Sequence, residues 1–183
     1  MFRAFNQAAK LLGVYVNAVK AVYEVETEDK VFLPNGDPKT LFERHKFYKY
    51  TNKQCKLSDI CQSKRGGYGK FSAQLGKLKR AIKINKKAAY FATSFGGFQI
   101  MGFNYKDAGY SNVYDFAEDM LSKDEDKHLM AFCNVVAHDK KKTKYLKNKN
   151  WAGFARRYNG PKYKDNHYDT KLKKAYNEAK KRK

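Results

Sequence analysis

Apolar residues recur at intervals of three and four through most of this chain, which is the spacing that one face of an α-helix requires. The segments with this spacing are residues 3–12, 18–26, 71–82, 86–93, 112–121, 123–137, 151–158 and 165–180. No apolar run approaches the roughly 18 residues that a transmembrane helix needs. The spacing therefore predicts a mainly α-helical fold built from many short helices.

One stretch near the N-terminus departs from the helical spacing. Residues 34–38 form a turn cluster of Pro, Asn, Gly and Asp, and the flanks 30–33 and 39–48 are aromatic and β-prone. We therefore expect a β-hairpin over these flanks. The polar, glycine-ended stretch 51–69 and the lysine run 140–149 are predicted to be loops.

The length of 183 residues suits a single domain spanning residues 1–183, with a short basic tail at about 177–183. The odd count of three cysteines argues against a complete disulfide framework. Cys55 and Cys61 are close enough in sequence to bridge, but we expect them and Cys133 to be free thiols of a reducing compartment. The histidines are scattered and zinc-type cysteine pairs are absent from the sequence, so no metal or other cofactor is expected.

The charge of the chain points to a polyanionic partner. Lys and Arg number 39 against 18 Asp and Glu, which gives a net charge of +21. Nucleic acid, an anionic membrane or a bacterial cell wall would each attract such a protein. The 14 Tyr and 13 Phe make it too aromatic for a disordered polyelectrolyte. Asn17 and Lys20 interrupt the apolar N-terminal stretch, so we expect no signal peptide.

Glu26 is the acidic residue whose position most suggests chemistry. It shares a predicted helix face with Val19, Val22 and Tyr23, at the C-terminal end of that helix. Burial and the negative end of the helix dipole both disfavour a carboxylate there and raise its pKa. A carboxylic acid that stays protonated near neutral pH is what a glycosidase uses to protonate a leaving oxygen. The alternative is a structural Glu that reaches solvent or pairs with a lysine.

Glu43 is the second candidate carboxylate. A strand over this segment would place Leu41, Glu43 and His45 on one face, with the carboxylate between apolar neighbours. Such a group either takes part in catalysis or forms a structural ion pair with Arg44 or a lysine. Both interpretations remain open at this point.

Several segments occur together in an order that has a known counterpart. They are residues 21–26 (AVYEVE), 35–38 (NGDP), 41–47 (LFERHKF), 66–69 (GGYG), 92–102 (ATSFGGFQIMG), 151–155 (WAGFA), 158–161 (YNGP) and 168–172 (YDTKL). Over about residues 10–176 the chain resembles the N-acetylmuramidase domain of phage endolysins, a member of the lysozyme-like superfamily. Two pieces of that pattern, FERH (residues 42–45) and GFQIMG (residues 97–102), are specific in combination.

The resemblance implies a mainly α (α+β) lysozyme-like fold, with two helical lobes, a small β-hairpin and a glycan-binding groove between the lobes. It implies that Glu26 is the general acid for cleavage of the β-1,4 bond between N-acetylmuramic acid and N-acetylglucosamine in peptidoglycan. The candidate substrate-binding residues are Thr27, Gln99, Tyr105, Tyr158 and Asn159. Gln99 resembles the Gln of a Gly-x-x-Gln-Ile element that lines the sugar groove, and Tyr158 the Tyr of a Tyr-Asn-x-Gly element near the acid. Structural packing is the alternative for both.

The chain departs from the family pattern in two places. Thr27-Glu28-Asp29 stands where the family usually has a Ser and a glycine pair, and Phe95 stands where it tends to have Trp. Thr27 can supply the hydroxyl of the missing Ser. Besides Glu43, Asp29 and Asp37 are alternatives for activating water or stabilising charge, as is the acetamido group of the substrate.

Other functions compatible with the sequence are a lytic transglycosylase, which cuts the same bond without water, and a basic wall-binding or nucleic-acid-binding protein without catalysis. No nucleic-acid partner is expected, because the sequence has neither an RNP-type motif nor zinc spacing. The expected partners are peptidoglycan strands and an anionic cell-wall or outer-membrane surface that basic residues contact. We expect a monomer, made in the host cytoplasm and released to the wall by a holin-type pore.

Overall fold

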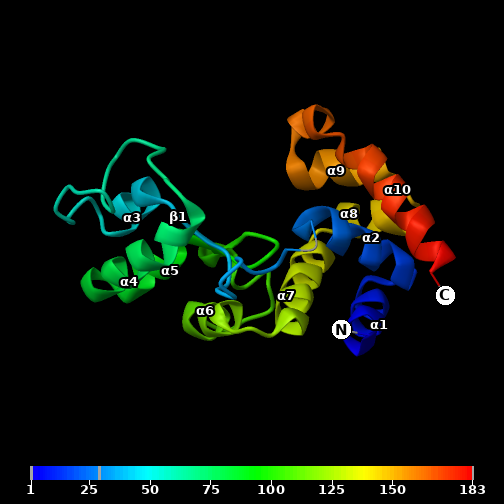
Figure 1. Cartoon of the computed structure of the whole chain (residues 1–183), viewed down its shortest axis with the longest axis horizontal. Coiled ribbons are helices and arrows are strands. Elements are labelled where there is room, and N and C mark those ends of the chain that lie inside the picture. Colours follow the sequence, from blue (N-terminus) through cyan, green and yellow to red (C-terminus); the bar gives the residue numbers. More distant parts are fainter. Residues whose placement is uncertain (1, 29, 183) are drawn as a thin grey trace. The chain divides into compact units, whose positions relative to one another are not determined.

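The computed structural model describes residues 2–28 and 30–182, so the candidate carboxylate Asp29 lies outside the described residues. The α-helices are α1 Phe2–Leu12, α2 Val16–Thr27, α3 Arg44–Tyr50, α4 Gln74–Ile84, α5 Lys86–Phe91, α6 Val113–Leu121, α7 Glu125–His138, α8 Lys140–Lys147, α9 Trp151–Asn159 and α10 Tyr168–Lys181. The strands are β1 Thr40–Phe42, β2 Thr93–Phe95 and β3 Ile100–Met101, and the 3-10 helices are η1 Phe71–Ala73, η2 Gly102–Asn104 and η3 Pro161–Asn166. The chain is mainly helical, as the apolar spacing predicts (Figure 1). Within the described residues, no helix is long and apolar enough to cross a bilayer.

The chain divides into two compact units, of which unit 1 comprises residues 1–30 and 129–183. In unit 1, α10 packs against α2 and α9, α9 packs against α8, and α1 packs against α2. The apolar face predicted for α2 is buried, with Val19 and Val22 no more than 2% exposed. Leu172 of α10 is fully buried. The division of the chain into domains stays a prediction.

Unit 2 comprises residues 31–128 and contains a small antiparallel sheet with the strand order β1-β2-β3. Thr40 pairs with Phe95 and Phe42 with Thr93, while β3 pairs with the other edge of β2. Helix α4 packs against β1 and α5, and α5 packs against α3 and α6. Phe42, Phe95 and Phe116 are almost fully buried and form part of the core.

The predicted hairpin is largely wrong. Among its described residues the stretch has one isolated antiparallel bridge, between Phe32 of the first flank and Pro38 of the turn cluster. Strand β1 pairs instead with β2, about fifty residues later in the chain. The second flank stops being a strand at Phe42, because residues from Arg44 onward turn into α3. This turn brings the fully buried Phe47 ring within 5.5 Å of the Phe42 ring, so burial of aromatic surface outweighs the β-propensity of the segment.

The lysine run at residues 140–149 is a helix rather than the predicted loop. Helix α8 begins after Asp139, whose carboxylate accepts hydrogen bonds from the backbone N–H groups of Lys141 and Lys142. Leu146 is 1% exposed and anchors the helix to unit 1. A capping residue and one apolar anchor are therefore enough to order this charged segment. At the C-terminus, α10 extends to Lys181, so residues 177–181 are helical.

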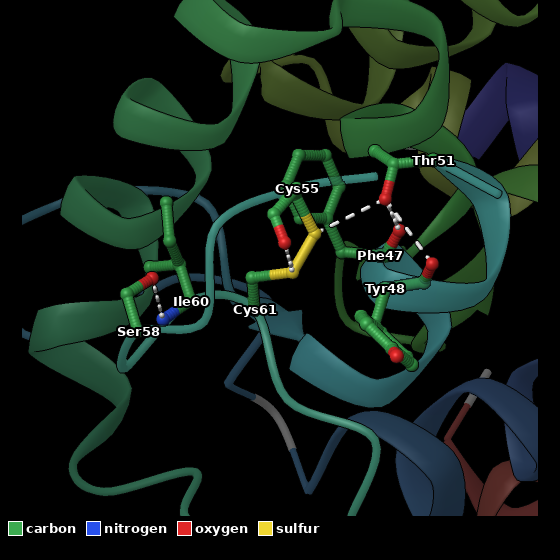
Figure 2. Close-up of a disulfide and its surroundings, with 7 residues drawn as sticks. All are labelled: Phe47, Tyr48, Thr51, Cys55, Ser58, Ile60 and Cys61. Carbon is green, nitrogen blue, oxygen red and sulfur yellow. Dashed lines mark hydrogen bonds between the residues drawn. A yellow bond between two sulfur atoms is a disulfide. The ribbon is translucent and has the colours of Figure 1, made fainter. Parts of the chain in front are cut away.

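Cys55 and Cys61 form a disulfide, so the prediction of three free thiols is wrong for this pair (Figure 2). The hydroxyl of Thr51 donates to the carbonyl of Phe47 at 2.9 Å and lies 3.1 Å from Cys55 Sγ. Both cysteines are buried although the loop around them is polar. The disulfide therefore holds together a loop that has few apolar side chains to pack. Cys133 is free and buried.

Candidate active site

Glu26 lies in the last turn of α2 and is partly buried. The helix ends at Glu28, which adopts a left-handed conformation with φ of 49° and donates its backbone N–H to the carbonyl of Glu24. Burial raises the pKa of Glu26 from an ordinary 4.5 to about 7. A hydrogen bond donated by Asn159 lowers the pKa and opposes part of this effect. The carboxyl group is thus substantially protonated at neutral pH, in the direction that its sequence position predicts.

Asn159 is the residue of α9 that contacts Glu26. Its Nδ2 donates to Glu26 Oε1 over 3.5 Å, which joins the C-terminal ends of α2 and α9 within unit 1. The two residues are 133 positions apart in sequence. The structure therefore brings together the candidate acid and one of the candidate substrate-binding residues.

Tyr158 lies beside this pair and packs tightly. Its ring stacks on Phe154 with centroids 5.7 Å apart and meets the edge of Phe132 at 5.5 Å. Burial, and then the negative charge of Glu26, raise the pKa of Tyr158 well above its usual value, so the phenol stays neutral. A neutral phenol close to the acid can donate a hydrogen bond, but the ring itself is also part of the packing of unit 1.

Tyr168, the first residue of α10, is a member of this cluster that residue patterns did not single out. Burial raises its pKa, and the carboxylates of Glu26 and Glu28 add to the rise. The available signal was its place at the start of the 168–172 segment of the family resemblance. Nothing in local spacing indicates that the start of α10 lies beside the end of α2.

Thr27 follows the acid and is almost fully buried at 1% exposure. Its hydroxyl donates to the carbonyl of Tyr23 at 2.7 Å, one helical turn back. The Thr27 hydroxyl, which the resemblance assigns to substrate binding, therefore donates its hydrogen bond within α2.

Gln99 lies in the turn between β2 and β3 of unit 2, with a left-handed φ of 49°. The hydroxyl of Ser94 donates to Gln99 Oε1 at 2.9 Å, and Gln99 Nε2 donates to the carbonyl of Gly96 at 2.8 Å. The carboxamide therefore holds the turn in shape. Tyr105, which follows η2, is half-buried with its ring 6.0 Å from that of Phe91.

Glu43 belongs to unit 2 and precedes the first residue of α3. His45 Nε2 lies 3.3 Å from Glu43 Oε2, and the Glu43 side chain is 13% exposed. Burial lowers the pKa of His45, while the charge of Glu43 acts in the opposite direction. Glu43 thus contacts a histidine in the first turn of the helix that follows it, rather than Arg44 or a lysine as the sequence suggested. Asp37 accepts a hydrogen bond from Asn35 in its turn.

The structure groups the sequence-predicted residues in two sets. The set in unit 1 is Glu26, Thr27, Tyr158 and Asn159, and the set in unit 2 is Glu43, Gln99 and Tyr105. Among the described residues, no cluster of three or more His, Cys, Asp or Glu side chains is arranged to hold a metal ion. The chemistry that the unit 1 set can perform is proton transfer by a carboxylic acid next to neutral hydrogen-bond donors.

The chain is similar to a known protein family and to solved structures. The sequence profile of the Muramidase family, described as N-acetylmuramidase, matches residues 15–180. The crystal structure of Burkholderia AP3 phage endolysin is 39% identical in sequence and superposes with a TM-score of 0.86, covering 98% of this chain and 70% of that chain. No curated protein matches the chain. The similarity extends over the segments that contain Glu26, Gln99 and Tyr158.

Proposed function

The chain belongs to the N-acetylmuramidase family and is a lysozyme-like peptidoglycan hydrolase, and we propose that Glu26 is its general acid. The bond that we propose it cleaves is the β-1,4 linkage between N-acetylmuramic acid and N-acetylglucosamine. The observation that carries the proposal is the raised pKa of Glu26, about 7, beside the amide of Asn159. An acid must hold its proton at working pH to deliver it, and an ordinary exposed Glu does not.

The proposed reaction begins with proton transfer from Glu26 to the glycosidic oxygen as the bond to the anomeric carbon breaks. Asn159 donates to Oε1, which leaves Oε2 to carry the transferable proton. An oxocarbenium-like centre develops on the sugar and is then attacked by water. The loss of the proton leaves Glu26 as a carboxylate, which Asn159 stabilises.

We propose Glu43 for the second role, activation of water or stabilisation of the positive centre. Its carboxylate is largely shielded from solvent and lies 3.3 Å from the ring nitrogen of His45. Asp37 and the acetamido group of the substrate remain alternatives. Glu43→Gln separates the roles: a catalytic Glu43 gives a loss of kcat at unchanged melting temperature, whereas a purely structural one gives a lower melting temperature with kcat retained.

We propose Thr27, Tyr158, Asn159, Gln99 and Tyr105 as the residues that contact the glycan. Tyr158 and Asn159 are supported by their place next to Glu26. For Gln99, the support is the ordered turn that its carboxamide maintains, which fixes the backbone of the segment 96–99. We further propose that the protein acts as a monomer and meets the anionic wall through exposed lysines of α10, among them Lys171, Lys173 and Lys174. Release through a holin-type pore stays a prediction.

The test is the substitution Glu26→Gln, which keeps the shape of the side chain and removes the proton. We expect a fall in peptidoglycan hydrolysis of about 10²–10⁴-fold, the range that one general acid contributes, with an unchanged circular dichroism spectrum. The matched control is Glu24→Gln on the same helix, where Glu24 lies 3.8 Å from Arg182. Activity of Glu26→Gln within tenfold of wild type would overturn the assignment.

The products identify the bond and the chemistry. Mass spectrometry of digested sacculi should show fragments ending in reducing N-acetylmuramic acid. Fragments ending in 1,6-anhydro sugars would instead indicate a lytic transglycosylase, and fragments ending in reducing N-acetylglucosamine would place the cut at the other glycosidic bond.

A further inference from the structure

A pocket of about 460 Å³ lies on α8, α9 and the start of η3, wholly within unit 1. It is distinct from the cluster around Glu26, since none of Glu26, Tyr158 and Asn159 lines it. The polar residues that line it are Lys141, Tyr145, Asn150, Arg156, Arg157 and Tyr163. Lys141, Arg156 and Arg157 are cationic, and the residues that the structure shows lining the pocket include no Asp or Glu. The pocket therefore favours an anionic ligand.

Gly153 shapes the wall of this pocket. A Cβ atom at this position would lie 2.8 Å from Cδ1 of Tyr145 and 3.0 Å from Cγ of Asn150, so only glycine lets α9 approach the Tyr145 ring so closely. Asn150 is also fixed, because its Oδ1 accepts the backbone N–H of Gly153 at 2.8 Å. The wall of the pocket around Asn150 and Gly153 is thus fixed before a ligand binds.

The cations of the pocket are not all neutralised. Arg157 donates through Nε to Asp139 Oδ2 at 2.7 Å, so its charge is balanced within the protein. Arg156 is exposed, and no described residue forms a hydrogen bond or ion pair with its guanidinium. The same holds for the ammonium group of Lys141. A guanidinium fork next to an ammonium group suits a carboxylate, which the fork binds through two parallel hydrogen bonds.

The position of the pocket on α9 favours a ligand that belongs to the glycan substrate. Arg156 precedes Asn159 by three residues, so the two lie on the same helix face, about 4.5 Å apart along the axis. Asn159 in turn donates to Glu26. The stem peptides of peptidoglycan carry carboxylates and are attached to N-acetylmuramic acid, the sugar whose bond is cut. A peptide carboxylate therefore comes near the acid whenever the glycan is bound.

We propose that the pocket formed by Lys141, Asn150 and Arg156 with their neighbours binds a carboxylate of the stem peptide and so selects peptide-bearing glycan strands. This inference rests on the proposed function, because it requires cleavage near Glu26. It assigns to α9 a role in substrate selection in addition to holding the acid.

The direct test is binding, measured by calorimetry with catalytically silenced protein carrying Glu26→Gln. The ligands are soluble glycan fragments with their stem peptides and the same fragments after an amidase has removed the peptides, which leaves only the lactyl carboxylate on each N-acetylmuramic acid. We expect Arg156→Gln to weaken binding of peptide-bearing fragments about tenfold, the scale of one charge-assisted hydrogen-bond pair, and to leave peptide-free fragments unaffected. The matched control Arg3→Gln removes an exposed arginine of α1 outside the pocket and should change neither affinity.

Lys141→Gln is the second variant and should act in the same direction as Arg156→Gln. Equal weakening of both fragments would overturn the proposal, because it would indicate a general charge effect. The same variants are also tested for binding to phosphatidylglycerol vesicles. If they lose vesicle binding but keep wild-type affinity for the peptide-bearing fragments, the proposal is overturned and the pocket is assigned to membrane phosphate. The assay reads binding, so a failure of Glu26 as the general acid, seen as retained hydrolysis by Glu26→Gln, is recognised separately.

Discussion

Two opposing influences act on the carboxyl group of Glu26. Burial raises its pKa by disfavouring the charged form, and the amide of Asn159 lowers it by donating to that form. The balance leaves the group near 7, where it can both give and regain a proton at neutral pH. We therefore propose that Asn159, besides contacting the glycan, positions Glu26 and limits how far burial raises its pKa.

Asn159→Ala tests this role. Without the donor the ionised form of Glu26 loses a stabilising bond, so the pKa rises and protonation persists to higher pH. The descending limb of the kcat/KM profile, which reports the protonated acid, should move to higher pH than in wild type. The pH at which kcat/KM falls does not depend on the maximum value of kcat/KM, so a general loss of activity does not obscure the result. Asn166→Ala, an exposed asparagine of η3, is the control; a limb that stays in place or moves to lower pH would contradict the account.

At the residue scale, the sequence singled out Glu26 as the candidate acid but not the side chains around it. Helical spacing placed Glu26 on the face of Val19 and Val22, and that face is buried. The contact with Asn159 spans 133 residues, and no local pattern encodes such a distance. The left-handed backbone of Gln99 and the two bonds of its carboxamide likewise depend on the folded turn.

Gln74 shows how a polar side chain can organise several elements. It is fully buried at the start of α4, where its Oε1 accepts the backbone N–H of Phe42 in β1 at 3.2 Å. Its Nε2 donates to the carbonyls of Tyr68 and Lys70, the latter at 3.1 Å. One carboxamide thus links the sheet, a helix and the glycine-rich loop of unit 2.

We expect Gln74→Ala to destabilise the protein by about 3 kcal/mol, because buried polar groups left without a partner cost about 1–3 kcal/mol each. The free energy of unfolding in urea provides the measurement. Gln7→Ala, an exposed position on α1, makes the same substitution and should change it by less than about 0.5 kcal/mol. Equal stability of the two variants would show that Gln74 does not link these elements.

Elements with a continuous apolar face were predictable, and elements fixed by distant partners were not. Helices α1, α2 and α7 lie close to their predicted ranges. The flank 39–48 contains β-prone aromatic side chains, but β1 takes its partner from β2 far along the chain and α3 follows. For α8, the cap Asp139 was visible in the sequence, whereas the burial of Leu146 against unit 1 was not.

The pairing of Cys55 with Cys61 was also not predicted from the sequence, although the two residues are close along the chain. An odd count excludes complete pairing but does not say which two side chains meet. The pair closes a loop of sequence separation 6, which the polar composition of residues 51–69 gave no reason to order.

The net charge of +21 acts on the whole molecule, and we propose that it draws the protein to an anionic wall. Long-range attraction is screened by salt, with a screening length of about 10 Å at 0.1 M that shortens as salt increases. The rate of lysis of whole sacculi should therefore fall steeply as ionic strength rises to about 0.3 M. Cleavage of a short, peptide-free oligosaccharide should depend far less on salt, since it carries only the lactyl carboxylates of its N-acetylmuramic acid residues. A flat profile on sacculi would show that the charge does not assist the enzyme.

The central claim is that the Glu26 carboxyl group holds its proton near neutral pH. Its carboxyl carbon can be followed by ¹³C NMR across pH, with the signal assigned by its absence in Glu26→Gln. We predict a titration midpoint of about 7. A midpoint at the ordinary value of 4.5 would mean that the group is ionised at neutral pH and would contradict its role as the general acid.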